Sequence, residues 1–535
     1  MKEDMGKTRI RLPQLTLAIA ALSVSLATAG STTSAPSLDD APTSRPASPK
    51  VTEALGKKVG PMGPADARHF LARTGFGGTL TEIGETANLS REAAVDQLLA
   101  KIQPEALQLP PAYTEQPLAD RRPSRGASRE ERQMFNRVRR QEMTALRGWW
   151  AAEMALTDSP FTERLTLFWH NHFVSESRKV KDADLMYQQN ALLRRHAAGN
   201  FRALLRQIST DGAMVIYLDS QQNRRGKPNE NYARELYELF TLGEGHYTED
   251  DIRETARALT GWRVNRRENS VNFVRRQHDS TSKMIFGDRG RHDLDDVIRI
   301  VLEKPQVAQH IVGKLWQEFV SPDRNEAEIA AIAQVFRDSN YELKPLYRAL
   351  FLTPSFWIET NRGALFRSPA DLVIGTARVL GIERVPPGSL VRAMAGMGQA
   401  LFDPPNVKGW PGGERWITTD SLLGRRQFIE RSLLGLAGRA ARRGMDENSM
   451  EGGSMDGSMD DGKGRPDRRR RGRRRPNPMT PLRDSWLALG STNQERAQLL
   501  ETYLCPLNAI TEPKRSEDPA ETLSRLLLDP TYQLK

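Results

Sequence analysis

Two histidines one residue apart, His170 and His172, are the first residues of this 535-residue chain whose type and spacing indicate chemistry. Imidazoles bind transition metals, and on a strand side chains at i and i+2 face the same way, so the pair could share a metal there. On a helix the two side chains diverge by about 200°. Unless the helix breaks between them, at most one joins a given metal site, and the alternative is a structural role for both.

A second candidate group lies in the segment 229–247, where an amphipathic helix is followed by a glycine-punctuated loop. Its carboxylates and imidazole could hold a divalent cation or transfer protons. The alternative is an ordinary amphipathic helix in which Arg234 and Glu238 form an i, i+4 ion pair. The candidate catalytic residues are Glu235 and His246, and the candidate binding residues are Asn229, Asn231 and Arg234.

Two further segments carry candidate residues. His278 and Asp279 are adjacent, and Lys283 follows four residues after the Asp, which is typical of a metal ligand or base with a charged partner, or of a structural turn. The loop 397–417 is rich in Pro and Gly, and loops of that kind often carry sites. The candidate binding residues of this loop are Asn406, Lys408, Trp410 and Trp416.

The two tryptophans of that loop allow two interpretations. Their rings could offer stacking faces to a sugar or an aromatic ligand. Alternatively, both rings fasten the loop to the rest of the protein.

The elements that must position these residues are predicted to be helices. Leu165, Phe168, Trp169 and Phe173 recur at helical spacings, and alternating strand-like runs are scarce. The sequence therefore predicts an all-α fold, a large multi-helix body with irregular Pro/Gly/Trp loops. Thr248 is predicted to cap a helix that Gly261 closes. In the segment 229–240, we expect an apolar stripe made by Tyr232, Leu236 and Leu239.

Residues 1–29 have the pattern of a secretory signal peptide: early basic residues, an apolar stretch and the small residues Ala27-Thr28-Ala29. We expect cleavage before Gly30 and a periplasmic or secreted protein. The apolar stretch is shorter than the roughly 20 residues that span a bilayer, so the mature chain is expected to have no transmembrane span. Residues 30–60 are rich in Ser, Pro, Thr and Ala and are predicted to be a flexible linker.

A second composition break covers residues 438–478, where an acidic Met/Gly/Ser stretch passes into an arginine block. Such a segment cannot form a core, and we expect a disordered insertion. It separates a helical domain at 61–437 from C-terminal helices at 479–535 that complete it. The methionines could hold Cu(I), and the arginines could bind an envelope polyanion or an acidic glycan. Nucleic acid is an unlikely partner because no aromatic residues interleave with the block.

The cysteine count and the absence of one motif argue against two classes of protein. One cysteine cannot form a disulfide within its own chain, so this is no disulfide-stapled scaffold. No glycine-rich phosphate loop opens a helix after a strand, which argues against nucleotide use. The formal charge is +11.

Six separated motifs, in order, resemble the bacterial domain-of-unknown-function family 1800. They are Arg68 to Gly77, Phe168 to Phe173, Asn229 to Gly243, Ala256 to Trp262, His278-Asp279, and Pro404 to Trp416, followed by Leu526 to Leu534 near the end. The resemblance implies an exported, helical protein that is often encoded beside a sulfatase-like protein, and it implies no reaction. Phe240 stands where many relatives have His, so a metal ligand at that position would be lacking here.

Two functions follow as hypotheses. The first is a metal-assisted hydrolase acting on an envelope or extracellular polymer, with a divalent metal held by the His and carboxylate residues above. The second is a non-catalytic helical scaffold or binding protein that works with an envelope partner, such as a sulfatase-like protein. The second is favoured by the absence of a complete nucleophile, base and orienting set in the sequence.

The signal peptide is directly testable. When the full chain is expressed in a bacterium with a periplasm, the exported protein is expected to begin at Gly30, because the residues before it match signal-peptidase preference. Intact-mass spectrometry of the exported fraction measures this. Recovery of the chain with residues 1–29 attached would contradict the prediction.

Overall fold

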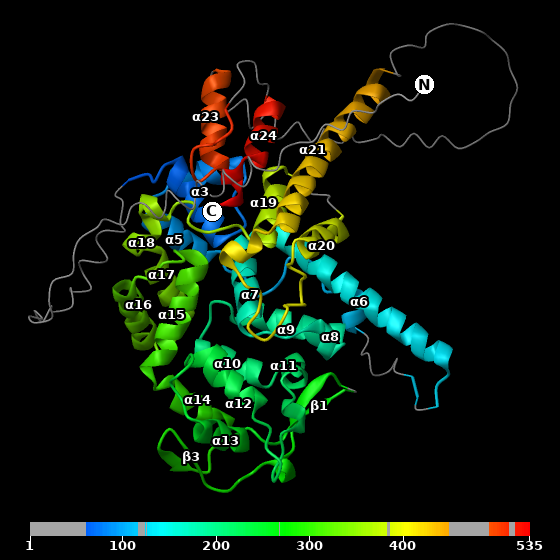
Figure 1. Cartoon of the computed structure of the whole chain (residues 1–535), viewed down its shortest axis with the longest axis vertical. Helices are drawn as coiled ribbons and strands as arrows, with labels where there is room; N and C mark the ends of the chain where they lie inside the picture. Colours follow the sequence, from blue (N-terminus) through cyan, green and yellow to red (C-terminus); the bar gives the residue numbers. More distant parts are fainter. Residues whose placement is uncertain are drawn as a thin grey trace, which may run out of the picture. The chain divides into compact units, whose positions relative to one another are not determined.

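The computed structural model describes residues 60–115, 123–124, 126–266, 268–381, 386–448, 492–512 and 519–535. These ranges are built almost entirely of helices, with two small two-stranded sheets (Figure 1). The predicted all-α class is confirmed, and the strands, of three or four residues each, are a local addition to it.

The first part of the described chain is helical throughout. Its elements are α3 (Pro64–Thr74), α4 (Leu80–Ala87), α5 (Arg91–Ala100), η1 (Ala112–Glu115), α6 (Arg129–Leu156), α7 (Pro160–His172), α8 (Ser177–Val180), α9 (Ala183–His196), α10 (Phe201–Ser209), α11 (Gly212–Tyr217) and η3 (Ser220–Gln222).

The middle part carries a π-helix and both sheets. Its elements are α12 (Asn231–Glu235), the π-helix η4 (Leu236–Thr241), α13 (Glu249–Ala258), β1 (Trp262–Asn265), β2 (Ser270–Phe273), η5 (Arg275–Gln277), β3 (Lys283–Ile285), β4 (Asp288–Gly290) and α14 (Leu294–Leu302). Each sheet is an antiparallel pair, with Trp262 opposite Phe273 in one and Lys283 opposite Gly290 in the other.

The last part returns to helices. Its elements are α15 (Pro305–Phe319), α16 (Glu326–Asp338), α17 (Leu343–Phe351), α18 (Pro354–Trp357), η6 (Glu359–Asn361), α19 (Pro369–Val379), α20 (Pro387–Gly396), η7 (Gly413–Trp416), α21 (Thr419–Asn448), α23 (Asn493–Leu504), α24 (Pro519–Leu528) and η8 (Pro530–Gln533).

Local sequence sets the limits of α13. The Thr248 side chain accepts the Asp251 N–H, and the Asp251 carboxylate accepts the Thr248 N–H, which is the reciprocal bonding of a capping box. Beyond its other end, Gly261 has φ +106°, and a Cβ there would lie 3.1 Å from the Phe273 ring. The predicted cap at Thr248 is confirmed, whereas the helix ends at Ala258 with Leu259 as its C-cap, before Gly261 is reached.

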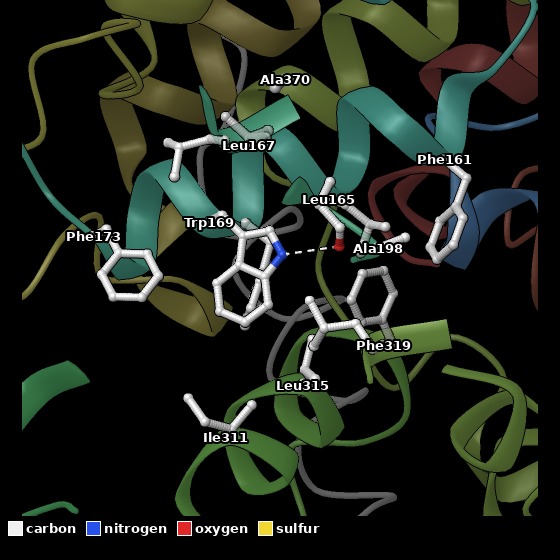
Figure 2. Packing of buried hydrophobic residues seen from close by; sticks show 14 of the residues in the cluster. Phe161, Leu165, Leu167, Trp169, Phe173, Ala198, Ile311, Leu315, Phe319 and Ala370 are labelled. Atoms are coloured by element: carbon white, nitrogen blue, oxygen red, sulfur yellow. Dashed lines mark hydrogen bonds between the residues drawn. The ribbon is translucent and has the colours of Figure 1, made fainter. Parts of the chain in front are cut away.

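Helix α7 lies inside the protein, because eleven of its thirteen residues are buried. Trp169 is fully buried among apolar side chains from α7 itself and from α15, among them Leu315 and Phe319 (Figure 2). Its indole Nε1 donates to the Ala197 carbonyl oxygen at 3.2 Å. A helix buried on all sides usually carries only apolar residues. The polar residues of α7 therefore need partners inside the protein.

Glu163 and Arg194 supply one such pairing. Arg194 donates through Nε and Nη2 to the two carboxylate oxygens of Glu163 at 2.6 and 2.9 Å, and both side chains are at most 2% exposed. The Trp150 indole also donates to Glu163, at 2.9 Å. This bidentate pair joins α7 to α9, and the Trp150 indole joins α6 to the same carboxylate.

Arg164 belongs to a second buried group, centred on Asp371. The Arg164 guanidinium pairs with Asp371 on α19 and, at 2.5 Å, with Glu318 on α15. Lys535 Nζ donates to the other Asp371 oxygen at 2.8 Å. Although burial alone would raise the pKa of Asp371, Arg164 and Lys535 hold it well below the usual value. One carboxylate thus compensates two buried cations that come from distant parts of the sequence.

The last residues are joined to the segment before α19 by backbone bonds. Lys535 N–H donates to the Leu365 carbonyl at 2.7 Å, and Arg367 N–H donates to the Gln533 carbonyl at 2.8 Å. Helices α23 and α24 pack on each other, and α23 also packs on α3. The family-like segment Leu526 to Leu534 is therefore joined to the segment that precedes α19.

One element crosses a boundary that was drawn from composition. Helix α21 continues to Asn448, beyond the boundary predicted at 437, because residues 438–448 include several Ala and Arg, which are good helix formers. The proposed signal peptide, nearly all of the linker at 30–60 and residues 449–478 of the insertion lie outside the described residues. Among the described residues, no helix combines the length and the apolarity needed to cross a bilayer.

The Asp371 group predicts a large loss of stability on substitution. Asp371→Asn leaves Arg164 and Lys535 buried with less compensating charge, so the free energy of unfolding is expected to fall by about 3 to 5 kcal/mol. Urea denaturation followed by circular dichroism measures it. The matched control is Asp295→Asn, whose partner Arg206 is exposed, and its effect is expected to stay below about 1 kcal/mol.

The pH dependence of stability has a defined sign. Because the pKa of Asp371 is lowered by folding, its stabilisation is complete above the unfolded pKa of about 4 and is lost as the pH falls. Asp371→Asn is therefore expected to flatten the acid limb of stability against pH. An unchanged acid limb would contradict the role assigned to this carboxylate.

Candidate functional site

The two histidines of α7 face different surroundings. His170 is fully buried, with ring centroids 5.4 Å from Trp150 and Phe402 and 5.7 Å from Trp410. Neither of its ring nitrogens has a hydrogen-bond partner, and burial lowers its pKa to about 3. His172 instead donates through Nε2 to the Phe240 carbonyl at 3.1 Å. The two side chains do not converge, in keeping with the divergence expected on a helix.

The π-helix η4 changes the pattern expected for the segment 229–240. Leu242 N–H and Gly243 N–H both donate to the Tyr237 carbonyl, at 2.9 and 3.0 Å. Because a π turn shifts the helical phase, Tyr237 and Phe240 are fully buried, and Leu239 is only half-buried. The predicted apolar stripe is confirmed for Tyr232 and Leu236, which are buried, and Leu239 packs against the core while only half-buried.

Carbonyl oxygens of η4 are bonded by basic side chains. The Leu239 carbonyl accepts from Lys314 Nζ at 2.9 Å and from His310 Nε2 at 3.0 Å, and the Phe240 carbonyl accepts from His172. Lys314 Nζ also lies 3.4 Å from Nδ1 of His172. His172, His310 and Lys314 thus form a buried basic cluster beneath η4.

Burial sets the charge state of this cluster. It lowers the pKa of Lys314 to about 8, and burial together with Lys314 lowers the pKa of His310 to about 4. The pKa of His172 lies well below its usual value for the same reasons. At neutral pH the two imidazoles are therefore neutral and the one buried charge is that of Lys314, held by a carbonyl oxygen and an imidazole nitrogen.

Above the cluster, charged side chains face solvent. Lys408 Nζ lies 3.4 Å from Glu244 and 3.6 Å from Glu238, and the Tyr247 hydroxyl donates to Glu238 at 3.3 Å. Burial and the neighbouring Glu238 raise the pKa of Glu235, while Lys408 opposes them. We call the set Glu235, Glu238, Glu244 and Lys408 the Glu–Lys face.

Asn171 fixes the loop that carries Lys408. Its side-chain oxygen accepts the Trp410 N–H at 2.7 Å. Gly409, at φ +85°, presses its backbone against Asn171 so closely that a Cβ would collide with the amide. The last turn of α7, the π-helix and the loop 404–416 therefore meet at one place, although each was predicted separately.

The tryptophans of that loop are part of the packing. Trp410 is 5% exposed and Trp416 is 6% exposed, and both belong to the hydrophobic core. Their rings therefore fasten the loop, as in the alternative interpretation, and offer no open stacking face.

Other predicted binding residues make local bonds. Asn229 accepts the Asn231 N–H at 3.0 Å, and Asn406 accepts the Lys408 N–H at 2.9 Å, both two residues along the chain. These are turn-forming bonds. Arg234 pairs with Glu249 through two 2.7 Å bonds rather than with Glu238 as predicted, because the π turn and the loop bring the start of α13 beside it.

His278 and Asp279 lie in a turn that bonds to neighbouring residues. Asp279 accepts from Arg257 Nε at 2.9 Å and from the Thr281 N–H at 3.0 Å, and His278 lies 3.1 Å from the Thr260 carbonyl. Burial alone would raise the pKa of Asp279, but hydrogen bonds from Thr281 and Arg257 lower it to about 2. The nearby Lys283 amine is 2% exposed and donates to three carbonyl oxygens.

The predicted residues thus divide into two places. Glu235 and Lys408 meet on the Glu–Lys face, with His172 beneath it, and the exposed His246 is close enough to His310 to lower its pKa. His278 and Asp279 form the separate turn just described. Within the residues that the structure describes, no three His, Cys, Asp or Glu side chains gather in a way that could hold a metal ion.

Three residues of this region were missed in the sequence. Asn171 stands between the two histidines, and its amide could have been noticed as a loop anchor. His310 and Lys314 lie on α15, whose spacing is that of an ordinary amphipathic helix. Nothing in the sequence indicates that they meet His172, because the contact depends on how α15 packs against η4.

Comparison with known proteins gives one finding. The family model "Protein of unknown function (DUF1800)" matches residues 69–534, nearly the whole chain. No curated protein and no solved structure matches the sequence.

The buried amine predicts a rise of stability at alkaline pH. Because folding lowers the pKa of Lys314 to about 8, the unfolded chain binds more protons between pH 8 and the ordinary lysine pKa of about 10.4. The wild-type free energy of unfolding is expected to gain about 1 to 2 kcal/mol from this residue over that range. Lys314→Met is expected to remove the gain, as measured by urea denaturation at several pH values.

The matched control is Lys344→Met on α17, where the lysine is exposed. This variant should keep the wild-type dependence on pH. If both variants followed the wild-type curve, the charge state assigned to Lys314 would be incorrect.

Proposed function

The chain belongs to the DUF1800 family of proteins of unknown function, and we propose that it is an exported, non-catalytic helical binding protein that binds its ligand through the Glu–Lys face. The observation that carries the proposal is the position of Lys408. Its ion pairs with Glu238 and Glu244 join the loop 404–416 to η4 and the loop after it. Segments far apart in the sequence thereby present one charged surface.

The charges of this surface indicate a class of ligand. The Glu–Lys face has three carboxylates and one ammonium group, so negative charge is in excess. Glu244 and Lys408 have more than half of their side-chain area exposed. Carboxylates bind ammonium and hydroxyl groups by charge-assisted hydrogen bonds. The ligand we propose is an amine- and hydroxyl-bearing glycan, such as an envelope polymer that contains amino sugars. Export is supported by the pattern of residues 1–29.

Binding is favoured over metal-assisted hydrolysis by what the other candidate residues do. His172 bonds to a backbone carbonyl, His278 lies against the Thr260 carbonyl, and Asp279 pairs with Arg257. These bonds serve the fold and occupy the groups that a metal or a substrate would need. A sulfatase-like partner remains an expectation from the family resemblance.

A second candidate function has one observation in its favour. Glu235 has a raised pKa beside Glu238, and two carboxyls with different proton affinities can act as general acid and base. This arrangement would suit a metal-free hydrolase of the same glycan. Glu235→Gln separates the two functions, because the amide keeps the shape of the side chain and cannot transfer a proton.

Binding is tested with a glucosamine oligomer and a glucose oligomer of equal length, using the mature chain from Gly30 and isothermal titration calorimetry. The glucosamine oligomer is expected to bind more tightly, and Glu238→Gln to weaken it about tenfold through the loss of a charged hydrogen bond. The matched control is Glu326→Gln on α16, an exposed carboxylate that pairs with Arg324 and lies outside the Glu–Lys face. Failure of both oligomers to bind would refute the proposed ligand class.

Hydrolysis is followed in the same samples by chromatography. The binding proposal expects intact oligomers after prolonged incubation, both with the wild type and with Glu235→Gln. Shortened products whose formation Glu235→Gln slows by about 10² to 10⁴ would establish the hydrolase instead.

A further inference from the structure

A cavity of about 580 Å³ lies between α3 and α23. Its walls come from α3, from the η6 segment, from α23 and from the residues that follow α23. The residues that matter for the argument are Arg68, Glu359, Arg362, Glu501, Thr502 and Cys505. This volume is in the range of sites for small organic ligands and exceeds what a single small ion needs.

Arg68 is the wall residue whose bonding is incomplete. It is 4% exposed, and its Nη1 has no hydrogen-bond partner. Arg73, five residues later on the same helix, shows the structural alternative. Its guanidinium donates to the carbonyls of Phe319 and Val320, at 3.1 and 2.8 Å, and to that of Asn361 at 2.5 Å. Arg73 has one unpartnered nitrogen of its own, Nε, but both of its terminal nitrogens are bonded, whereas Nη1 of Arg68 is not.

The groups around Arg68 do not supply an anion to its Nη1. Asp66 forms ion pairs with Arg362 and, at 2.8 Å, with Arg91. Glu501 accepts the Ala509 N–H at 2.6 Å, and Glu359 stands exposed at the rim. Burial, Arg367 and Arg362 lower the pKa of Arg68 to about 9, so it remains charged at neutral pH. The interior of the cavity therefore holds a cation without a bonded counter-ion.

The thiol in the wall does not compensate this charge. Cys505 is 4% exposed, and burial raises its pKa to about 11. It is therefore neutral at physiological pH and forms part of the wall. The Thr502 hydroxyl already has an acceptor, since it donates to the Gln498 carbonyl at 3.0 Å.

We propose that this cavity binds a small organic oxyanion, a molecule with a carboxylate or phosphate group that accepts from the guanidinium of Arg68, which lines the cavity. A guanidinium binds both kinds of oxyanion, and the contact is strong because it is charge-assisted. The rest of the cavity accommodates the organic part. The site is independent of the Glu–Lys face, which is built by other elements.

The test is isothermal titration calorimetry of the mature chain with inorganic phosphate, glucose 6-phosphate and glucuronate at constant ionic strength. At least one of the two sugar anions is expected to bind more tightly than inorganic phosphate. Arg68→Gln is expected to weaken that binding about tenfold or more, as charged hydrogen bonds of this kind do. The matched control, Arg206→Gln, removes an exposed arginine elsewhere and should bind like wild type.

Because Arg68 is buried, Arg68→Gln could lose binding simply by failing to fold, so a second variant is needed. Thr502→Phe keeps Arg68 and places a ring in the cavity, so it should also abolish binding, while circular dichroism reports whether each variant is folded. Glu238→Gln should leave the binding unchanged, which separates this site from the Glu–Lys face.

Each outcome supports or overturns the proposal. Tighter binding of glucose 6-phosphate would identify phosphate as the preferred anionic group, and tighter binding of glucuronate would identify carboxylate. Equal binding of inorganic phosphate and the sugar phosphate would overturn the organic part of the proposal. Binding of none of the three probes, or wild-type binding by folded Arg68→Gln and Thr502→Phe, would overturn the site.

Discussion

The carboxylate of Asp371 is the group on which the helical body depends. It receives Arg164 from the central helix α7 and Lys535 from the last turn of the chain, and all three side chains are at most 5% exposed. A buried cation without a partner is strongly destabilising, so α7, α19 and the C-terminal segment must dock together. This requirement links the beginning, middle and end of the domain more tightly than any local sequence signal does.

The same requirement explains the residues that looked catalytic. A buried helix with glutamate, arginine and two histidines needs internal partners. Glu163, Arg164 and His172 of α7 obtain them from α9, α19 and a carbonyl group of η4, whereas His170 packs among aromatic rings without one. The π turn matters here because it turns the Leu239 and Phe240 carbonyls toward Lys314, His310 and His172. Polar residues in family-like motifs therefore serve the fold first, and the groups left facing solvent are those of the Glu–Lys face.

The two proposed sites are contrasting solutions to the placement of charge. On the Glu–Lys face, carboxylates and an ammonium group remain hydrated, so their pairing costs little and leaves them free to exchange partners with a ligand. In the cavity beside α3, one guanidinium has lost water without gaining a protein acceptor for Nη1. The first arrangement suits a weak, polyvalent ligand, and the second suits a small anion held at a single point.

Local rules explain how far the sequence alone could go. Helical spacing around Trp169 predicted the helical class and the cap at Thr248 predicted the start of α13, because each depends on residues a few positions apart. The register after Leu236, the burial of Trp410 and the meeting of Lys314 with His172 were not predictable in this way. The sequence by itself determined the family, the helices and the candidate residues. Only the tertiary structure decided which candidates bond to the fold and which face a ligand, because that choice depends on contacts between segments far apart in the chain.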